Sequence, residues 1–438
     1  MTLFIANSRA IKASLRLAGG AIALLAPISL LACGGGPSES TLGNGDFDDE
    51  VKVGILHSRS GTMAISENTV AEAELMAIDE INAAGGINIG DQSLKIVPIE
   101  EDGASDWPTF AEKAKKLIDQ DNVAVVFGGW TSASRKAMLP VFEAKDHLLF
   151  YPIQYEGQEC SKNIFYSGAT PNQQAEPAVE WLLNNKGKEF FLIGSDYVYP
   201  RTANTIIKEQ LKAQSGVLVG EDYLPLGNTE VAPIIAKIKQ ALPDGGVIVN
   251  TLNGDSNVAF FKQLKAAGIT PENNYAIMSF SIAEEEVAAI GPEYLQGTYA
   301  AWNFFQSLDT PASRAFTENF QAKYGDDRVT NDPAESAYMM VHLWAKAAEK
   351  ADSIDDDAVR QSLIGVSFEA PQGRVEVQPN HHLSKLVLIG EVQDDGMFKI
   401  LENKGVKKPV AWNQFVPETK GYSCDWTQNR PDAGKFKM

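Results

Sequence analysis

Short apolar segments alternate with amphipathic ones along the chain from residue 51 onward. The apolar runs 51–56, 94–99 and 123–127 have the length of β-strands. Between them, residues 68–83 and 110–120 repeat apolar side chains every three or four positions, as an amphipathic helix does. The run VAVVF at 123–127 is continuously apolar, which is typical of a parallel strand buried on both faces. This alternation predicts a doubly wound α/β sheet.

The same alternation starts again at residue 189. The strands predicted for this second series are 189–195, 217–224, 246–250 and 275–279, and the helices are 202–214, 231–241 and 257–267. Because one hydrophobic core rarely grows beyond about 300 residues, two series in a chain of 438 residues predict two α/β domains. In the tail the pattern becomes rich in β-strands, and we expect it to supply edge strands and crossings between the domains.

Residues 1–32 have the parts of a secretory signal peptide. A basic start is followed by an apolar run of about 16 residues, which is shorter than the roughly 20 residues that a membrane-spanning helix needs. The run ends in LLAC, which resembles the lipobox of bacterial lipoproteins and implies lipidation of Cys33. Residues 33–50 are rich in Gly and Ser and are expected to form a flexible tether. We therefore expect an exported, periplasmic protein that a lipid anchors to a membrane.

Net charge and cysteine content narrow the possible partners and bonds. The formal net charge is −19, whereas nucleic-acid-binding proteins need a basic surface, so a nucleic-acid partner is not expected. If Cys33 carries the lipid, Cys160 and Cys424 remain. In an exported protein two such cysteines suggest one disulfide, and the alternative is a pair of free thiols.

The chain contains none of the common catalytic motifs. It has no G-x-x-x-x-G-K-[ST], no G-x-S-x-G, no H-E-x-x-H and no C-x-x-C. His57 follows the first strand and is interpreted as a turn residue at a ligand cleft, because nothing in the sequence supplies an acid to orient it for catalysis. His381 and His382 are the one histidine pair and are expected in a surface turn. We therefore expect a protein that is not an enzyme.

Three acidic runs are candidates for calcium binding. They are 46–50, 99–106 and 324–332, and all are rich in carboxylate oxygen, which Ca²⁺ prefers. None has the spacing of an EF-hand loop, so a solvated acidic surface is the favoured interpretation. No cofactor is required, and a structural Ca²⁺ has no assigned place.

Aromatic and polar side chains follow the predicted strands. The carboxyl ends of parallel strands meet at one edge of a sheet, where open α/β sheets bind ligands, so we expect these side chains to line a cleft between the domains. Rings with neutral hydrogen-bonding groups suit a small, uncharged, polar ligand. The helix that begins at Ser132 adds free backbone N–H groups for a carbonyl oxygen. The candidate ligand-binding residues are Trp130, Ser132, Tyr151, Gln154, Asp196, Tyr197, Tyr199 and Asn253.

Several segments together resemble the urea-binding proteins of bacterial ATP-driven urea importers. They are GGWTSASRKAMLPVFE, LLFYPIQYEGQECSKNIFYSG, PNQQ, GSDYVYPR, DTPASRAF and APQGRVEV. The resemblance runs from about residue 51 to the C-terminus and extends to short-amide receptors and, more distantly, to branched-chain amino-acid binding proteins. It implies the type I periplasmic binding protein fold, in which two α/β domains joined by a hinge close around the ligand. It also implies delivery of that ligand to a membrane permease and its ATPase.

The resemblance also implies ligand contacts, at Trp130, Ser132, Tyr151, Tyr197 and Tyr199. Trp130 stands where related amide receptors usually have a tyrosine, and Gln154 lies in a turn where they differ, so selectivity could change at these two positions. Urea has one carbonyl acceptor and four N–H donors, and a buried polar group without a partner costs about 1–3 kcal/mol. A urea site therefore needs more acceptors than an acetamide site. The further candidates to supply them are Gln154, Asp196 and Asn253.

These expectations combine into one hypothesis about domains and function. The N-terminal lobe is expected at 51–165 and 303–370, and the C-terminal lobe at 166–302 and 371–438. The first lobe would bind urea and the second would close over it. The alternatives are a receptor for short amides or branched-chain amino acids, and a sensor for a signalling partner. A secreted amidase is disfavoured, because urea hydrolysis normally calls for a metal-bound nucleophile.

Overall fold

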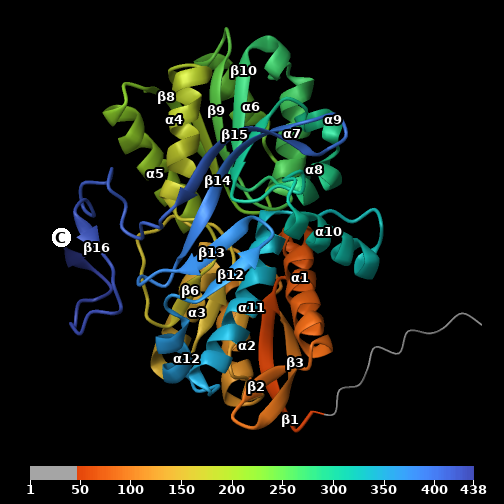
Figure 1. Ribbon diagram of the computed structural model, residues 1–438. Coiled ribbons are helices and arrows are strands. Elements are labelled where there is room, and N and C mark those ends of the chain that lie inside the picture. The colour runs from red at the N-terminus through yellow and green to blue at the C-terminus, as the bar shows by residue number, and fades with distance from the viewer. Residues whose placement is uncertain (1–46) are drawn as a thin grey trace, which may run out of the picture. The chain divides into compact units, whose positions relative to one another are not determined.

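A computed structural model describes residues 47–438 of the chain (Figure 1). The predicted signal peptide, Cys33 and most of the predicted tether lie outside these residues. Within them, no helix has both the length and the apolar character that a membrane crossing requires.

The first sheet has the strand order β2-β3-β1-β4-β5-β6. Its strands are β1 (Asp49–His57), β2 (Ile87–Ile89), β3 (Gln92–Asp102), β4 (Val126–Gly128), β5 (Leu149–Tyr151) and β6 (Ile164–Tyr166). All neighbours run parallel except β2, which pairs antiparallel with β3. The helices packed with this sheet are α1 (Ala64–Ala83), α2 (Trp107–Asp119), α3 (Ser132–Lys145), α11 (Asp332–Ala351) and α12 (Asp356–Leu363). Helix α1 thus begins four residues before the predicted start at 68.

The second sheet has the order β12-β13-β14-β11-β10-β9-β7-β8, and β15 pairs with β14. Its strands are β7 (Glu189–Ser195), β8 (Val217–Leu224), β9 (Gly246–Thr251), β10 (Tyr275–Ser279), β11 (Tyr299–Trp302), β12 (Ser367–Ala370), β13 (Gly373–Val377), β14 (Leu383–Val392) and β15 (Phe398–Lys407). The helices of this part are α4 (Ala175–Asn185), α5 (Val198–Ala213), α6 (Ala232–Ala241), α7 (Ser256–Ala266), α8 (Glu284–Ile290), α9 (Pro292–Leu295) and α10 (Pro311–Tyr324). Strands β7 to β11 are parallel, and the tail strands β14 and β15 add antiparallel neighbours, as predicted for the tail.

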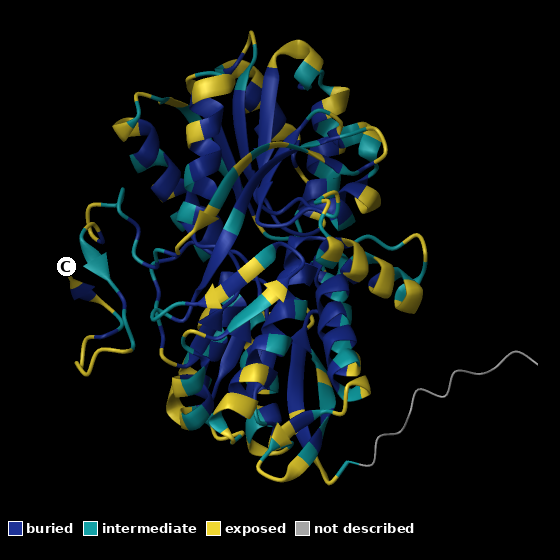
Figure 2. Cartoon of the chain, viewed as in Figure 1, coloured by how far each residue is buried: buried dark blue, intermediate teal, exposed yellow. Residues whose placement is uncertain are grey.

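The parallel strands of both sheets are largely buried, and the exposed residues lie mainly on the outer helix faces, in loops and on the tail strand β15 (Figure 2). One hydrophobic core joins residues from 51–166 with residues from 337–383, and the second joins residues from 191–305 with three from 388–398. The two doubly wound lobes are the α/β architecture that the sequence predicts. The exact domain boundaries given above remain a prediction.

Strand β14 connects the two sheets. Just before it, His382 forms a parallel bridge with Tyr166 of β6, and the carbonyl of His381 accepts from the Tyr166 N–H (2.8 Å). The strand then pairs with β11 in the second sheet. The prediction that His381 and His382 lie in a surface turn is therefore wrong, because both are buried, 1% and 0% exposed. Burial lowers the pKa of both, that of His382 to about 3, so neither ring carries a charge at neutral pH.

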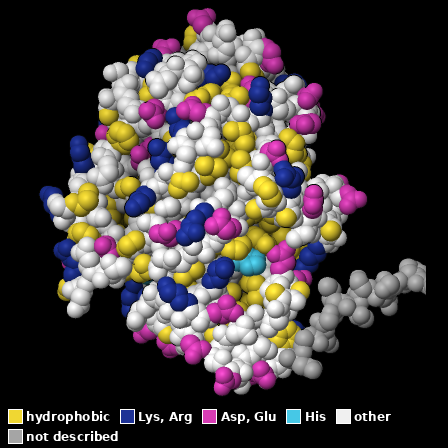
Figure 3. Space-filling model, in the orientation of Figure 1, with side chains coloured by type: hydrophobic (Ala, Val, Ile, Leu, Met, Phe, Trp, Pro, Cys, Tyr) yellow, Lys and Arg dark blue, Asp and Glu magenta, His cyan; other side chains and the backbone are white. Residues whose placement is uncertain are grey.

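Near the C-terminus, β16 (Tyr422–Ser423) and β17 (Phe436–Lys437) form a separate two-stranded sheet. Cys424 forms a disulfide with Cys160, the pairing that the cysteine count suggested. On the face shown in Figure 3, Lys and Arg side chains are interspersed with Asp and Glu side chains rather than gathered in one patch.

Candidate ligand-binding site

The loop between β4 and α3 presents the first candidate residues. Gly128 has φ +144°, and a Cβ there would lie 2.0 Å from the carbonyl oxygen of Leu56, so a glycine is needed for the chain to pass β1. Thr131 then caps α3, since its hydroxyl accepts from the Ser134 N–H (3.0 Å). This leaves the N–H groups of Ser132 and Ala133 without intrahelical acceptors, as at any helix N-terminus.

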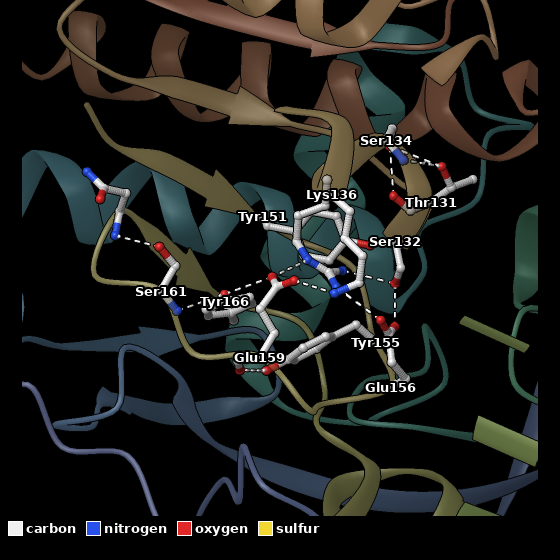
Figure 4. A network of polar contacts seen from close by, with 12 residues as sticks. Thr131, Ser132, Ser134, Lys136, Tyr151, Tyr155, Glu156, Glu159, Ser161 and Tyr166 are labelled. Carbon is white, nitrogen blue, oxygen red and sulfur yellow. Dashed lines mark hydrogen bonds and ion pairs between the residues drawn. The ribbon is translucent and has the colours of Figure 1, made fainter. Parts of the chain in front are cut away.

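Below this loop, charged side chains form a buried network (Figure 4). Arg135 is 0% exposed and donates through Nε to Glu159 (2.7 Å), through one terminal nitrogen to Ser132 (3.0 Å) and through the other to Glu156 (3.3 Å). Lys136 also donates to Glu159 (2.7 Å). Burial opposes ionisation of Glu159, but Arg135 and Lys136 outweigh it and lower its pKa to about 2. Two cations and two carboxylates thus neutralise each other beneath Ser132.

Tyr151 lies on top of this network at the end of β5. Its hydroxyl donates to the carbonyl oxygen of Trp130, and the Arg135 guanidinium lies 4.8 Å from its ring centroid. Burial raises the pKa of Tyr151, and the charge of Arg135 only partly offsets this, so the phenol keeps its proton. Its oxygen therefore has lone pairs to offer but no free hydrogen.

Three hydrogen bonds join the candidate residues of the first lobe to the second. Trp130 donates through Nε1 to the side-chain oxygen of Asn253 (3.1 Å). Gln154 donates through Nε2 to the Phe280 carbonyl (2.8 Å) and the Ser281 hydroxyl (3.2 Å). These oxygens fix the orientation of the Gln154 amide. Its Oε1 is buried and, among residues 47–438, has no hydrogen-bond partner.

Two tyrosines reach the same region from the start of α5. Tyr197 and Tyr199 are 6% and 5% exposed, and their ring centroids lie 6.4 Å apart. Burial raises the pKa of Tyr199, and Gln154 and Ser281 lie close enough to oppose this effect. Helix α5 begins at Val198 rather than at the predicted residue 202, so Tyr199 occupies its first turn.

Asp196 does not join the other candidates. It is exposed, and its carboxylate accepts from Nε of Arg201 (2.6 Å). The structure therefore brings together every candidate ligand-binding residue except Asp196. What the sequence reasoning missed is the pair Glu156 and Glu159, which follow Tyr151 in the same turn; two acids beside a buried strand end are the signal that was available.

His57 is the buried last residue of β1 rather than a turn residue at a ligand cleft. Its Nδ1 lies 3.2 Å from Glu67 and its Nε2 lies 2.8 Å from Glu74, both on α1. Burial disfavours the charged ring, but the two carboxylates prevail and raise its pKa to about 9. The expectation that no acid orients His57 is wrong: Glu67 and Glu74, seven residues apart on one helix face, hold it on both sides.

The described residues contain no group of three or more His, Cys, Asp and Glu side chains arranged to hold a metal ion. The possible structural Ca²⁺ therefore still has no assigned place.

Two doubly wound lobes with aromatic and polar side chains buried between them define a two-lobed binding protein of type I. The sequence profile of the periplasmic binding protein domain matches residues 51–418, and the chain belongs to this family.

Two relatives illustrate the range of similarity in sequence. Leu/Ile/Val-binding protein homolog 6 of Brucella melitensis biotype 1 is 22% identical over 359 residues, 80% of this chain and 90% of that protein. A limonene hydroxylase of Geobacillus stearothermophilus is 31% identical over 130 residues, which are 29% of this chain and only 24% of that protein.

Solved structures show the same fold. A solute-binding protein of an ABC transporter from R. palustris, in complex with benzoate, has a TM-score of 0.70 at 19% identity, over 82% of this chain and 98% of that one. The branched-chain amino acid transporter substrate-binding protein LivJ of Streptococcus pneumoniae, in complex with isoleucine, has a TM-score of 0.70 at 22% identity, over 82% and 100%. Likeness at these identities concerns the fold alone.

Proposed function

We propose that this chain is the extracytoplasmic solute-binding protein of an ABC importer and that it captures urea between its two lobes. Membership of the periplasmic binding protein family supports the general role and an exported location. In this proposal the lipid on Cys33 holds the protein near the permease to which it delivers its ligand. The protein makes and breaks no covalent bond.

The observation that carries the proposal is that buried polar side chains of the site donate their hydrogens to protein oxygens and not into the site. The Trp130 indole, the Tyr151 hydroxyl and the Gln154 amide all donate to protein oxygens, of Asn253, Trp130 and Phe280. On these three side chains the remaining hydrogen-bonding capacity is that of acceptors, above all the Oε1 of Gln154, which has no partner among residues 47–438. Acceptors call for a ligand rich in N–H donors. Urea has four N–H groups in a molecule of only four non-hydrogen atoms.

The helix N-terminus complements these acceptors. Urea has one carbonyl oxygen, and the N–H groups of Ser132 and Ala133 at the start of α3 suit it. Flat aromatic side chains, Trp130, Tyr197 and Tyr199, are buried beside these groups and suit the faces of a planar molecule. Acetamide has only one amino group and would leave acceptors unpaired, at a cost of about 1–3 kcal/mol for each.

The second candidate is a ligand with a carboxylate, such as a branched-chain amino acid, because the relatives named above bind or are named for such ligands. A carboxylate needs a donor clamp. Arg135 is the guanidinium buried in this region, and each of its three nitrogens already donates to Ser132, Glu156 or Glu159. This arrangement favours an uncharged ligand.

Closure of the lobes is the step that we propose to couple capture with delivery. Ser132 and Tyr151 would bind the ligand on the first lobe, and Tyr197 would close over it from the second. The contacts Trp130–Asn253 and Gln154–Phe280 would then form only in the closed shape.

Calorimetric titration of the purified protein with urea, acetamide, formamide, leucine and benzoate tests the proposal. We expect the tightest binding for urea, weaker binding for acetamide and formamide, and no heat of binding for the two carboxylates. Binding of leucine or benzoate without binding of urea would refute it.

A further inference from the structure

A buried ring of hydrogen bonds controls the direction of one hydroxyl in the candidate site. Glu156, which is 1% exposed, accepts from the Ser132 hydroxyl through Oε2 (2.5 Å) and from Arg135 through Oε1 (3.3 Å). Arg135 in turn donates to the Ser132 oxygen (3.0 Å). The three side chains thus close a ring beneath the start of α3 (Figure 4).

Within this ring the hydrogens have only one arrangement. A guanidinium can only donate, and an ionised carboxylate can only accept. The single hydrogen of Ser132 therefore points to Glu156, and one of its two lone pairs receives Arg135. A single lone pair of the Ser132 oxygen is left for any group outside the ring.

We propose that Glu156 is a specificity-determining residue of this site. By taking the hydrogen of Ser132 it turns that hydroxyl into an obligate acceptor toward the ligand. The site then favours a ligand that presents N–H over one of the same shape that presents an oxygen. This inference rests on the proposed function. It explains how Glu156, acting through Ser132 without touching the ligand, lets the site distinguish an amide or urea from a carboxylate.

The substitution Glu156→Gln reverses the ring. Because Arg135 always donates, the glutamine turns its carbonyl oxygen toward Arg135 and its NH₂ group toward Ser132. The Ser132 oxygen then accepts from both neighbours, and its hydrogen is released toward the ligand. We expect urea affinity to fall by about tenfold or more, because an N–H of urea then faces a hydroxyl hydrogen. Acetate, which offers only oxygens, should bind better.

The experiment titrates urea, acetamide and acetate into the wild-type protein and into Glu156→Gln, with thermal unfolding to verify the fold. Glu159→Gln is the matched control, because it removes the same charge from the same arginine without touching the hydrogen of Ser132. We expect the ratio of urea to acetate affinity to fall much further in Glu156→Gln than in Glu159→Gln.

Ser132→Ala provides the second readout and stays informative even if Glu156→Gln does not fold. An acceptor at Ser132 predicts that its removal costs urea more affinity than acetate, and a donor predicts the opposite. In the Ser132→Ala background, Glu156→Gln should shift the ratio no further than Glu159→Gln does, since Glu156 acts through that hydroxyl.

The outcomes separate this inference from the proposed function. Suppose that the wild-type protein prefers urea. The inference is then overturned if Glu156→Gln and Glu159→Gln shift the ratio of urea to acetate affinity equally, or if Ser132→Ala loses more affinity for acetate than for urea. Either result leaves the proposed function standing. Wild-type preference for acetate over urea, or for leucine or benzoate over urea in the titration described above, overturns both, because an obligate acceptor repels a carboxylate.

Discussion

The Gln154 side chain uses its hydrogen-bond donors but not its acceptor. Its NH₂ group joins the first lobe to Phe280 of the second, while its buried Oε1 has no partner among residues 47–438. A buried acceptor without a donor is costly, and this one lies among the candidate ligand-binding residues. In the proposed function its partner is an N–H group of the ligand.

Replacing Gln154 by Leu should therefore weaken urea binding. The change removes both the free acceptor and the bond to Phe280, and we expect a loss of about 1–3 kcal/mol in binding free energy, roughly 5- to 150-fold in affinity. Calorimetric titration measures the loss. Acetamide should lose less if its methyl group takes the place next to Gln154.

Asp196→Asn is the control for that measurement. Asp196 is exposed and paired with Arg201, and such surface ion pairs contribute about 0–1 kcal/mol. Urea affinity should stay within about threefold of the wild type. A loss as large as that of Gln154→Leu would show that Asp196 reaches the ligand after all.

At this scale the sequence predicts which residues meet, but not how their hydrogen bonds run. Trp130 and Tyr151 come together because parallel strands end at one edge of a sheet. Asp196 is instead exposed and paired with Arg201, five residues later in the chain, which no apolar pattern indicates. The pairing of Arg135 with Glu156 depends on the course of a turn that has no regular secondary structure, and no periodic pattern encodes it.

The turn at residues 152–160 carries both Glu156 and Glu159, and the C-terminal tail holds it in place. The Gln158 N–H donates to the Ala411 carbonyl (2.7 Å), and the disulfide joins Cys160 to Cys424. The network beneath Ser132 is therefore attached to a segment more than two hundred residues later in the chain.

Removing the disulfide should loosen this turn. We expect Cys160→Ser/Cys424→Ser to lose about 2–4 kcal/mol of stability and to expose the tail to protease. Urea affinity should fall as well, because Glu156 and Glu159 lose their support. Chemical denaturation, limited proteolysis with mass spectrometry and calorimetry measure the three effects.

A variant that loses stability while keeping full urea affinity and an intact tail would contradict the role assigned to the turn. Reduction of the wild-type protein under native conditions is the matched comparison, since it opens the same bond without changing a residue.

Helices and strands were predicted best where the apolar pattern extends over many residues. Most strands of the two sheets overlap the apolar runs that predict them, because continuous apolar runs leave little choice. Strand β4, however, begins at Val126 rather than at residue 123, and β6 was not predicted. Helices α1 and α5 start earlier than predicted. Ser66 and Tyr199, in their first turns, are buried at the contact between the lobes, and the apolar periodicity of a helix does not reveal such burial. Helices α4 and α8 were missed in the same way.

Across the whole molecule, several buried titratable side chains have raised pKa values, and each of them makes the folded state less stable as pH rises. Burial raises the pKa of Glu284 to about 8 and those of Glu286 and Glu335 to about 7. His57 is raised to about 9 by Glu74 and Glu67 against the effect of burial. All of these groups hold protons more tightly in the folded state than in the unfolded state.

The thermal midpoint should therefore fall as pH rises from 6 to 9. The contribution of His57 is complete below its ordinary value of 6.5 and is lost as pH rises through 9, and those of the carboxyl groups fade through 7 to 8. Calorimetric scans across this range measure the slope. His57→Gln should make the slope shallower above pH 7.

A midpoint that is constant or rises up to pH 9 would contradict this assignment. So would an equal slope in His57→Gln and the wild type.

The disulfide between Cys160 and Cys424 also has a consequence in time. A ribosome makes residue 160 long before residue 424, so the bond cannot form until the chain has grown by a further 264 residues. Most of the first lobe exists for the whole of that interval with its turn unsecured. A segment made much later than the turn is thus the one that secures the region where we expect the ligand to bind. A chain that stopped before residue 424 would carry every candidate contact residue and still lack the disulfide that holds the turn.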